Sequence, residues 1–242
     1  HTAPEAAAGG TLALPGFGDD ADPAEEAEAF AMDGEDEECL EAWCAAMLLQ
    51  CSRQLEAAAE GEAAEAIPDD RPVLAIGPTA NWGAKEWRAE HFAALVERLT
   101  APDGILPGAM VALMGGPDER DRARALIDAI PADRLIDLFG QELPAAYASM
   151  ARCALYIGND SGLMHLSAAS GAPTLGLFGP SPEARYRPWG GNAALVRTSE
   201  SYSELVDAPD FDHRNQATLM DGITVDEAVK AADDLWRRCA HK

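Results

Sequence analysis

From residue 73 onward, short apolar runs alternate with longer stretches in which apolar residues recur every three or four positions. Apolar runs bounded by glycine, proline or polar residues predict buried β-strands. They span residues 73–77, 110–114, 135–139, 154–158 and 174–178, with a sixth at 194–198. Strands separated by helices form a parallel sheet covered on both faces. The predicted fold class is therefore α/β, with a Rossmann-like parallel sheet.

Helical spacing of apolar residues fills the intervals between these strands. The residues expected to face inward from the first three helices are Phe92, Leu95, Val96, Leu99, Ala123, Leu126, Ile127, Ile130, Leu143, Ala146, Tyr147 and Met150. A further helix is predicted over residues 162–170. The last helix opens with the capping box Thr224-Val225-Asp226-Glu227 and is expected to run to about Cys239.

The first 71 residues have a different character. Residues 1–37 are mainly Ala, Gly, Pro, Asp and Glu, and they are expected to be mostly disordered because they bury too little apolar surface to offset their ordering entropy. Apolar residues at helical spacing predict one amphipathic helix over residues 40–58, and residues 61–72 are interpreted as a linker. We therefore divide the chain into an acidic arm, residues 1–71, and a Rossmann-like domain, residues 72–242.

Most of the net charge of −24 lies in this arm. Residues 1–71 contain 19 acidic and two basic residues, a net −17, whereas the remaining 171 residues carry −7. Such an excess of acid argues against nucleic acid or an anionic membrane surface as the main partner. It leaves room for a local basic site that binds a phosphorylated ligand.

The five cysteines form no CxxC pair and accompany no histidine cluster. This favours reduced thiols in a cytoplasmic protein and predicts no metal centre. No apolar run is long enough to span a membrane, and the first residues lack the features of a signal peptide. Peripheral association with a membrane stays open.

Ligands of an open parallel sheet bind beyond the carboxyl ends of the strands, so the segments that follow the strands matter most. The segment GPTANWGAKEW follows the first strand, and its Thr79 hydroxyl and Lys85 ammonium suit a phosphate. A surface loop whose Trp residues pack on the sheet is equally consistent. GGPDER follows the second strand, where Asp118 or Glu119 either caps a helix or accepts hydrogen bonds from ribose hydroxyls.

The segment NDSGLMH after the fourth strand gives the strongest indication. Asp160 and Ser161 stand where a helix begins, and Gly162 leaves room for a ligand. The free N–H groups and dipole of that helix suit a pyrophosphate, with His165 one turn away as a further donor. The alternative is an aspartate that caps the helix and a histidine satisfied within the protein. The loop after the fifth strand, GPSPEARYR, adds arginines that either complement a charged ligand or face solvent.

These segments, continued as NDSGLMHLSAASGAPTLGLFGPSPE and followed by YRPW, together resemble the ADP-heptose:lipopolysaccharide heptosyltransferases, glycosyltransferase family 9. The resemblance covers residues from about 72 to 236. It implies a GT-B enzyme, in which two Rossmann-like domains face each other across a cleft, and this chain resembles the C-terminal, donor-binding domain. The implied reaction is inverting transfer of heptose from ADP-heptose to a hydroxyl of the lipopolysaccharide core, without a metal or other cofactor.

The resemblance also implies roles for seven residues of this chain. They are Thr79, Lys85, Glu119, Asp160, Ser161, Gly162 and His165. The threonine and the lysine are implied contacts of the donor phosphates, and the glutamate of the ribose. The aspartate is implied to bind heptose hydroxyls, while the imidazole and the backbone at residues 161–162 cradle the pyrophosphate.

Members of this family also carry an N-terminal domain that holds the acceptor site and the catalytic base. Residues 1–71 contain no βαβ pattern, so no residue is assigned as the base. Three explanations are consistent with this. The chain is a piece of a longer enzyme and is inactive alone, its N-terminal region is altered, or it is a module that another chain completes. Two other functions stay open: a non-catalytic ADP-sugar-binding or interaction module, and a GT-B transferase that uses another nucleotide sugar.

Overall fold

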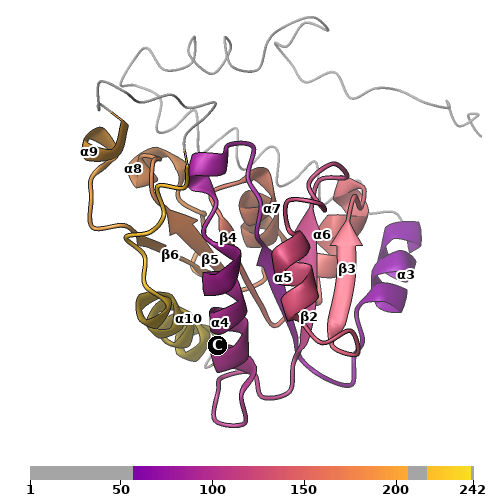
Figure 1. The fold of residues 1–242 in the computed structure, drawn as a ribbon. Helices are drawn as coiled ribbons and strands as arrows, with labels where there is room; N and C mark the ends of the chain where they lie inside the picture. Colours follow the sequence, from indigo (N-terminus) through magenta and orange to yellow (C-terminus); the bar gives the residue numbers. More distant parts are fainter. Residues whose placement is uncertain (1–56, 207–216, 241–242) are drawn as a thin grey trace, which may run out of the picture. The chain divides into compact units, whose positions relative to one another are not determined.

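Six parallel strands form one sheet in the computed structural model, which describes residues 57–206 and 217–240 (Figure 1). The strands are β1 (Val73–Gly77), β2 (Met110–Gly115), β3 (Leu135–Phe139), β4 (Leu155–Asn159), β5 (Thr174–Phe178) and β6 (Ala193–Arg197). Their order across the sheet is β3-β2-β1-β4-β5-β6, and every neighbouring pair is parallel. This is the strand order of a Rossmann sheet, which confirms the predicted fold class.

Helices cover both faces of the sheet. The helices of the described residues are α3 (Ala57–Ala66), the 3-10 turn η1 (Gly83–Lys85), α4 (Ala89–Thr100), α5 (Arg124–Ala129), α6 (Leu143–Ala151), α7 (Gly162–Ser170), α8 (Glu183–Tyr186), α9 (Tyr202–Val206) and α10 (Val225–Ala240). Apolar residues of α4, α5 and α10 share one buried cluster with the sheet, whereas those of α6 and α7 share the other. Figure 1 shows α4, α5 and α10 in front of the strands and α6 and α7 behind them.

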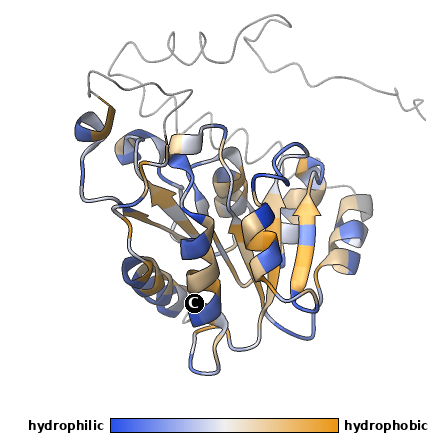
Figure 2. Cartoon of the chain, in the orientation of Figure 1, coloured by the Kyte–Doolittle hydropathy of each residue, from blue (hydrophilic) through white to orange (hydrophobic). Residues whose placement is uncertain are grey.

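Alternate residues of each central strand supply the two clusters. In β1, Leu74 and Ile76 face the α4 side, and Val73 and Ala75 face the α6 side. Because successive side chains of a strand point to opposite faces, a strand buried on both sides must be apolar at every position. Figure 2 shows this as hydrophobic colour along the strands, with hydrophilic colour on the outer surfaces of the helices.

The predicted strands and long helices match the structure closely, but the segment expected to be a loop after β5 contains the short helix α8, and two further corrections follow. Leu143 was expected to face inward, yet it is 62% exposed, because it opens α6 ahead of the residues that pack on the sheet, which begin at Ala145. Half of the predicted linker is helical: α3 continues to Ala66 and contacts α6, and Ile67 is buried. This alanine-rich stretch has high helix propensity but a weak apolar stripe, so periodicity missed it.

Several predictions fall on residues outside the described part of the chain. They are the disordered segment over residues 1–37 and the amphipathic helix over residues 40–58, apart from its last two residues, which begin α3. The capping box at Thr224, in contrast, is confirmed. The Thr224 hydroxyl accepts a hydrogen bond from the Glu227 N–H at 3.2 Å, and the Glu227 carboxylate accepts one from the Thr224 N–H at 2.9 Å.

A buried asparagine fixes the loop between β1 and α4 to the end of β4. The Asn159 side chain accepts a hydrogen bond from the Trp87 N–H at 3.0 Å and donates one to the Pro78 carbonyl at 2.8 Å. The indole of Trp87, itself buried, donates to the Ile223 carbonyl at 3.0 Å. The loop that follows β1 is thereby held over the neighbouring strand.

We expect Asn159→Ala to lower the free energy of unfolding, because two buried backbone groups lose their partner at about 1–3 kcal/mol each. Urea denaturation measured by circular dichroism checks this. Leu143→Ala serves as the control, with an expected change within about 0.5 kcal/mol because that side chain is exposed. Equal stability of Asn159→Ala and the wild type would contradict the role given to this clamp.

Candidate functional site

The strand order reverses between β1 and β4, and the candidate site lies at the carboxyl ends of these strands. The chain leaves β1 toward α4 on one face of the sheet and leaves β4 toward α7 on the other face. The segments after the two strands therefore diverge, which is where Rossmann folds bind their ligands. The segments that follow β2 and β5 begin at the same edge of the sheet, because all strands are parallel.

A lysine, an aspartate and a serine from three different segments meet at this edge. Lys85 Nζ donates to Asp160 Oδ2 at 2.7 Å, and Ser181 Oγ donates to the same oxygen at 2.7 Å. The side chains of Lys85 and Asp160 are only 18% and 6% exposed, so solvent screens their attraction little. No described residue donates to the other oxygen, Oδ1, which leaves that oxygen able to accept a hydrogen bond.

The Lys85 ammonium also lies over two aromatic rings. Its nitrogen is 5.9 Å from the centre of the Trp82 ring and 5.8 Å from that of Tyr186. Cation–π attraction acts at this range. The two rings and the Asp160 carboxylate thus hold the ammonium in place above the end of β4.

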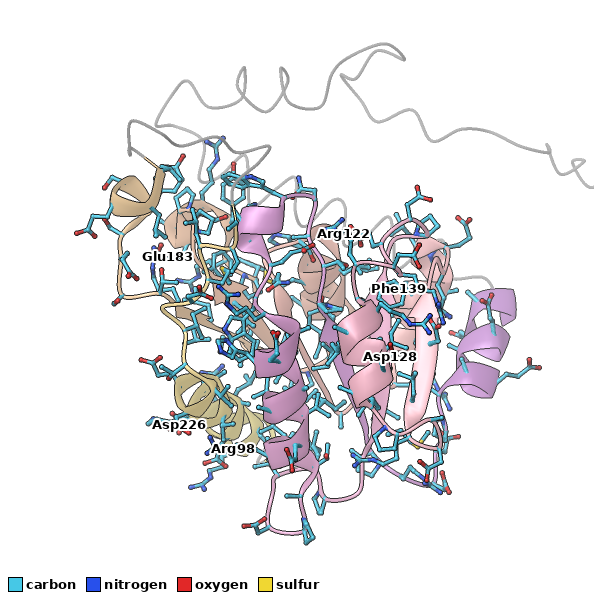
Figure 3. All side chains as sticks on the ribbon, in the orientation of Figure 1. Arg98, Arg122, Asp128, Phe139, Glu183 and Asp226 are labelled. Atoms are coloured by element: carbon cyan, nitrogen blue, oxygen red, sulfur yellow. The ribbon has the colours of Figure 1, made fainter. Side chains whose placement is uncertain are left out.

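A second cluster joins the segments after β1 and β2. Glu119 Oε2 accepts hydrogen bonds from the Thr79 hydroxyl and from the Gly116 N–H, each at 2.8 Å. Arg122 lies beside both Glu119, at 3.5 Å, and Glu86, and it also donates to the carbonyl of residue 80. Figure 3 shows Arg122 at the edge of the sheet where the strands end. One guanidinium thus pairs with two carboxylates, and the three side chains together keep a formal charge of −1.

The first turn of α7 offers unpaired donors. Its N-cap residue, Ser161, makes no side-chain capping bond, and the N–H groups of Ser161, Gly162 and Leu163 donate to no described residue. A Cβ atom at Gly162 would meet nothing within 4 Å, so this helix end is open. Free N–H groups and the positive end of the helix dipole attract anions, phosphate groups above all.

His165 lies one turn further along α7 and is neutral at physiological pH. Burial lowers the pKa of its imidazole below the ordinary 6.5; nearby Asp160 opposes this shift and Lys85 adds to it. A neutral imidazole carries one N–H donor and one acceptor nitrogen. Next to the open end of α7, it can donate to an anion without adding a charge.

The structure brings the seven predicted site residues to one edge of the sheet. Thr79 pairs with Glu119, and Lys85 pairs with Asp160, although neither pair was predicted. Sequence reasoning missed three further residues: Glu86, Arg122 and Ser181. Ser181 follows β5 within GPSP, directly beyond a strand end, and Arg122 stands three residues after Glu119, so both positions carried a usable indication.

The chemistry of this edge suits a ligand that combines phosphate with hydroxyl groups. The cationic and N–H donors suit the phosphate, and the carboxylate oxygens can accept hydrogen bonds from the hydroxyl groups. Within the described ranges, no group of three or more His, Cys, Asp or Glu residues is arranged to hold a metal ion. No helix among the described residues is long and apolar enough to cross a membrane.

The lowered pKa of His165 predicts a pH effect on stability. Since the unfolded chain protonates this imidazole near pH 6.5 and the folded chain resists it, its contribution is complete above pH 6.5 and is lost as the pH falls toward the folded pKa. The loss is at most about 1.4 kcal/mol per pH unit.

We expect NMR titration to place the His165 midpoint below 6.5. We also expect His165→Gln to lose less stability than the wild type between about pH 7 and about pH 5.5 in urea denaturation. The acidic residues titrate in both proteins, so the difference isolates the histidine. Identical pH profiles, or a midpoint above 6.5, would contradict the prediction.

Comparison with known proteins identifies the family of this chain. The family model of glycosyltransferase family 9 (heptosyltransferase) matches residues 46–213. Lipooligosaccharide heptosyltransferase 2 of Haemophilus influenzae is 29% identical over 194 residues, which are 78% of this chain and 54% of that relative.

Two solved structures show the same fold. The structure of Escherichia coli ADP-heptose LPS heptosyltransferase II is 23% identical with a TM-score of 0.61, over 77% of this chain and 54% of that one. The E. coli heptosyltransferase WaaC with ADP is 20% identical with a TM-score of 0.54, over 70% and 46%. The chain thus spans about half the length of the relatives it matches. Because the family model covers most of its residues, the chain belongs to glycosyltransferase family 9, the heptosyltransferases.

Proposed function

We propose that residues 72–242 form the sugar-nucleotide-binding domain of a heptosyltransferase, which transfers heptose from ADP-heptose to a lipopolysaccharide core acceptor with inversion. The open first turn of α7, flanked by Lys85 and Asp160, is the observation that carries this proposal. Family membership supports the reaction, and the ADP and ADP-heptose named for its structural neighbours support the donor. Residues 1–71 precede this domain as an acidic arm in the proposal, although α3 at the end of that arm packs against α6.

The donor diphosphate would lie on the free N–H groups of α7, with Lys85 and the neutral His165 as side-chain donors. Asp160 already gives its Oδ2 to two donors within the protein, so its Oδ1 is the oxygen left for a heptose hydroxyl. Lys85, between this carboxylate and the phosphates, reduces the repulsion between them. The departing nucleoside diphosphate is stabilised by the same donors, which lowers the barrier to transfer.

Thr79 and Glu119 would exchange partners when the donor binds. Their mutual hydrogen bond, at 2.8 Å, occupies the only hydroxyl proton of Thr79. A nucleotide supplies a phosphate oxygen for that proton and a ribose hydroxyl for the carboxylate. One internal hydrogen bond is then replaced by two to the ligand, while the Gly116 N–H and Arg122 keep Glu119 in place.

In this proposal, the site that binds the acceptor lies outside residues 72–242. No described residue is assigned as the base that deprotonates the acceptor hydroxyl. A cytoplasmic location, with peripheral association at the membrane that carries the acceptor, completes the proposal. It is supported by family membership and by the absence of a membrane-spanning helix in the described ranges.

We expect Lys85→Ala to weaken ADP binding by about 10- to 150-fold in calorimetric titration, the effect of losing one charge-assisted contact. Lys230→Ala is the matched control, because Lys230 lies exposed on α10 in an ion pair with Asp234. Circular dichroism verifies that both variants fold. Unchanged ADP affinity of folded Lys85→Ala would contradict the proposed phosphate site.

The choice of nucleotide separates the heptosyltransferase from a transferase that uses another donor. Titration of the wild type with ADP, UDP and GDP is expected to show binding strongest for ADP. A transfer assay with ADP-heptose and a lipopolysaccharide core acceptor then separates an enzyme from a binding module. Preference for UDP or GDP would contradict the proposed donor.

A further inference from the structure

Tyr156 in β4 delivers a hydroxyl to the point where the strand order reverses. Its side chain is fully buried on the α6 and α7 face of the sheet. The hydroxyl lies against the backbone of Gly77 and Gly158, near the carboxyl ends of β1 and β4. A Cβ atom at either glycine would overlap this hydroxyl. Glycine at both positions therefore leaves space for the tyrosine oxygen next to the edge of the sheet that forms the candidate site.

The buried hydroxyl has no hydrogen-bond partner among the described residues. A buried polar group without a partner costs about 1–3 kcal/mol, whereas phenylalanine would fill nearly the same space without that cost. Stability of the structure described here therefore does not account for a tyrosine at this position.

A second buried hydroxyl without a partner lies next to the first. Ser161 Oγ makes no hydrogen bond to any described residue, although Ser161 is the N-cap of α7 and serine is favoured there because it usually bonds the first turn. Burial raises the pKa of the Tyr156 hydroxyl, and the Ser161 hydroxyl, close enough to act as its partner, opposes that rise. The Tyr156 oxygen thus lies beneath the edge of the sheet, and the Ser161 oxygen lies between it and the open first turn of α7.

We propose that Tyr156 is a positioning residue for the nucleoside diphosphate: its hydroxyl donates to Ser161 Oγ, and Ser161 donates to a phosphate oxygen. This rests on the proposed function. Tyr156 itself does not touch the ligand, because its oxygen lies beneath the backbone of Gly77 and Gly158, whereas the partly exposed Ser161 stands at the open end of α7. A serine hydroxyl donates one hydrogen bond and accepts another, so it can link the two groups.

The phosphate supplies the acceptor that completes this chain of hydrogen bonds. The tyrosine fixes the rotamer of Ser161, and a hydroxyl that accepts one hydrogen bond donates the next one more strongly. The two unpartnered hydroxyls thus act together as a preformed extension of the α7 anion site. Their cost in the unliganded protein is recovered when a phosphate binds.

The test is a double-mutant cycle on the full chain, with ADP as the probe in calorimetric titration and with thermal unfolding measured alongside. Tyr156→Phe is expected to weaken ADP binding by about 2- to 10-fold, the range of one net hydrogen bond, without lowering Tm. Ser161→Ala is expected to weaken ADP at least as much. The double variant should bind no worse than Ser161→Ala, because the tyrosine acts through the serine.

Tyr147→Phe is the matched control. The Tyr147 hydroxyl donates to the Ala169 carbonyl at 3.3 Å, so this variant should lose some stability and keep its ADP affinity. Wild-type affinity in Tyr156→Phe, a Tm well below that of the wild type, or additive losses in the double variant would each overturn the positioning role.

The wild type and Lys85→Ala in the same titration distinguish the two levels of the proposal. Failure of the wild type to bind ADP rejects the proposed function, and this inference with it. Binding that Lys85→Ala loses but Tyr156→Phe retains rejects the role of Tyr156 alone.

Discussion

The reversal of strand order between β1 and β4 is the constraint on which the candidate site depends. A parallel sheet places every strand's carboxyl end on one edge, and the reversal sends the next helices, α4 and α7, to opposite faces. The loop that follows β1 can present its backbone to a ligand there when the sheet beneath holds it in position. Asn159 fixes it by bonding both ends of the loop after β1, at Pro78 and Trp87. The first turn of α7 and Lys85 then face the same space.

A chain with a net charge of −24 needs a particular local arrangement to bind an anion. The carboxylates at the ligand edge are paired: Asp160 with Lys85, and Glu86 and Glu119 with Arg122. Pairing removes much of their repulsion toward a phosphate, and the N–H groups of α7 add a positive potential without adding a formal charge. The local field, rather than the total charge, therefore decides what this edge attracts.

Buried polar side chains also gather at this edge. Thr79, Asn159, Asp160 and Ser181 are all buried residues, and each is held by a hydrogen bond to a residue from another segment. Side chains fixed in this way lose little freedom when a ligand arrives, which favours binding. Tyr156 differs, because its buried hydroxyl has no such partner in the described part of the chain.

The sequence by itself determined the strands, most of the helices and the segments that carry the site, because periodicity and turn residues record which positions are buried and where each strand ends. It placed Lys85 and Asp160 correctly beyond two strands. Only the tertiary structure decided that these residues, 75 positions apart, form an ion pair. The fold likewise brings Ser181 to the same aspartate and Arg122 to Glu86 and Glu119. It also decided that Leu143 faces solvent. The physical reason is that periodicity is a local property, whereas a contact of about 3 Å depends on strand order and on packing between distant segments.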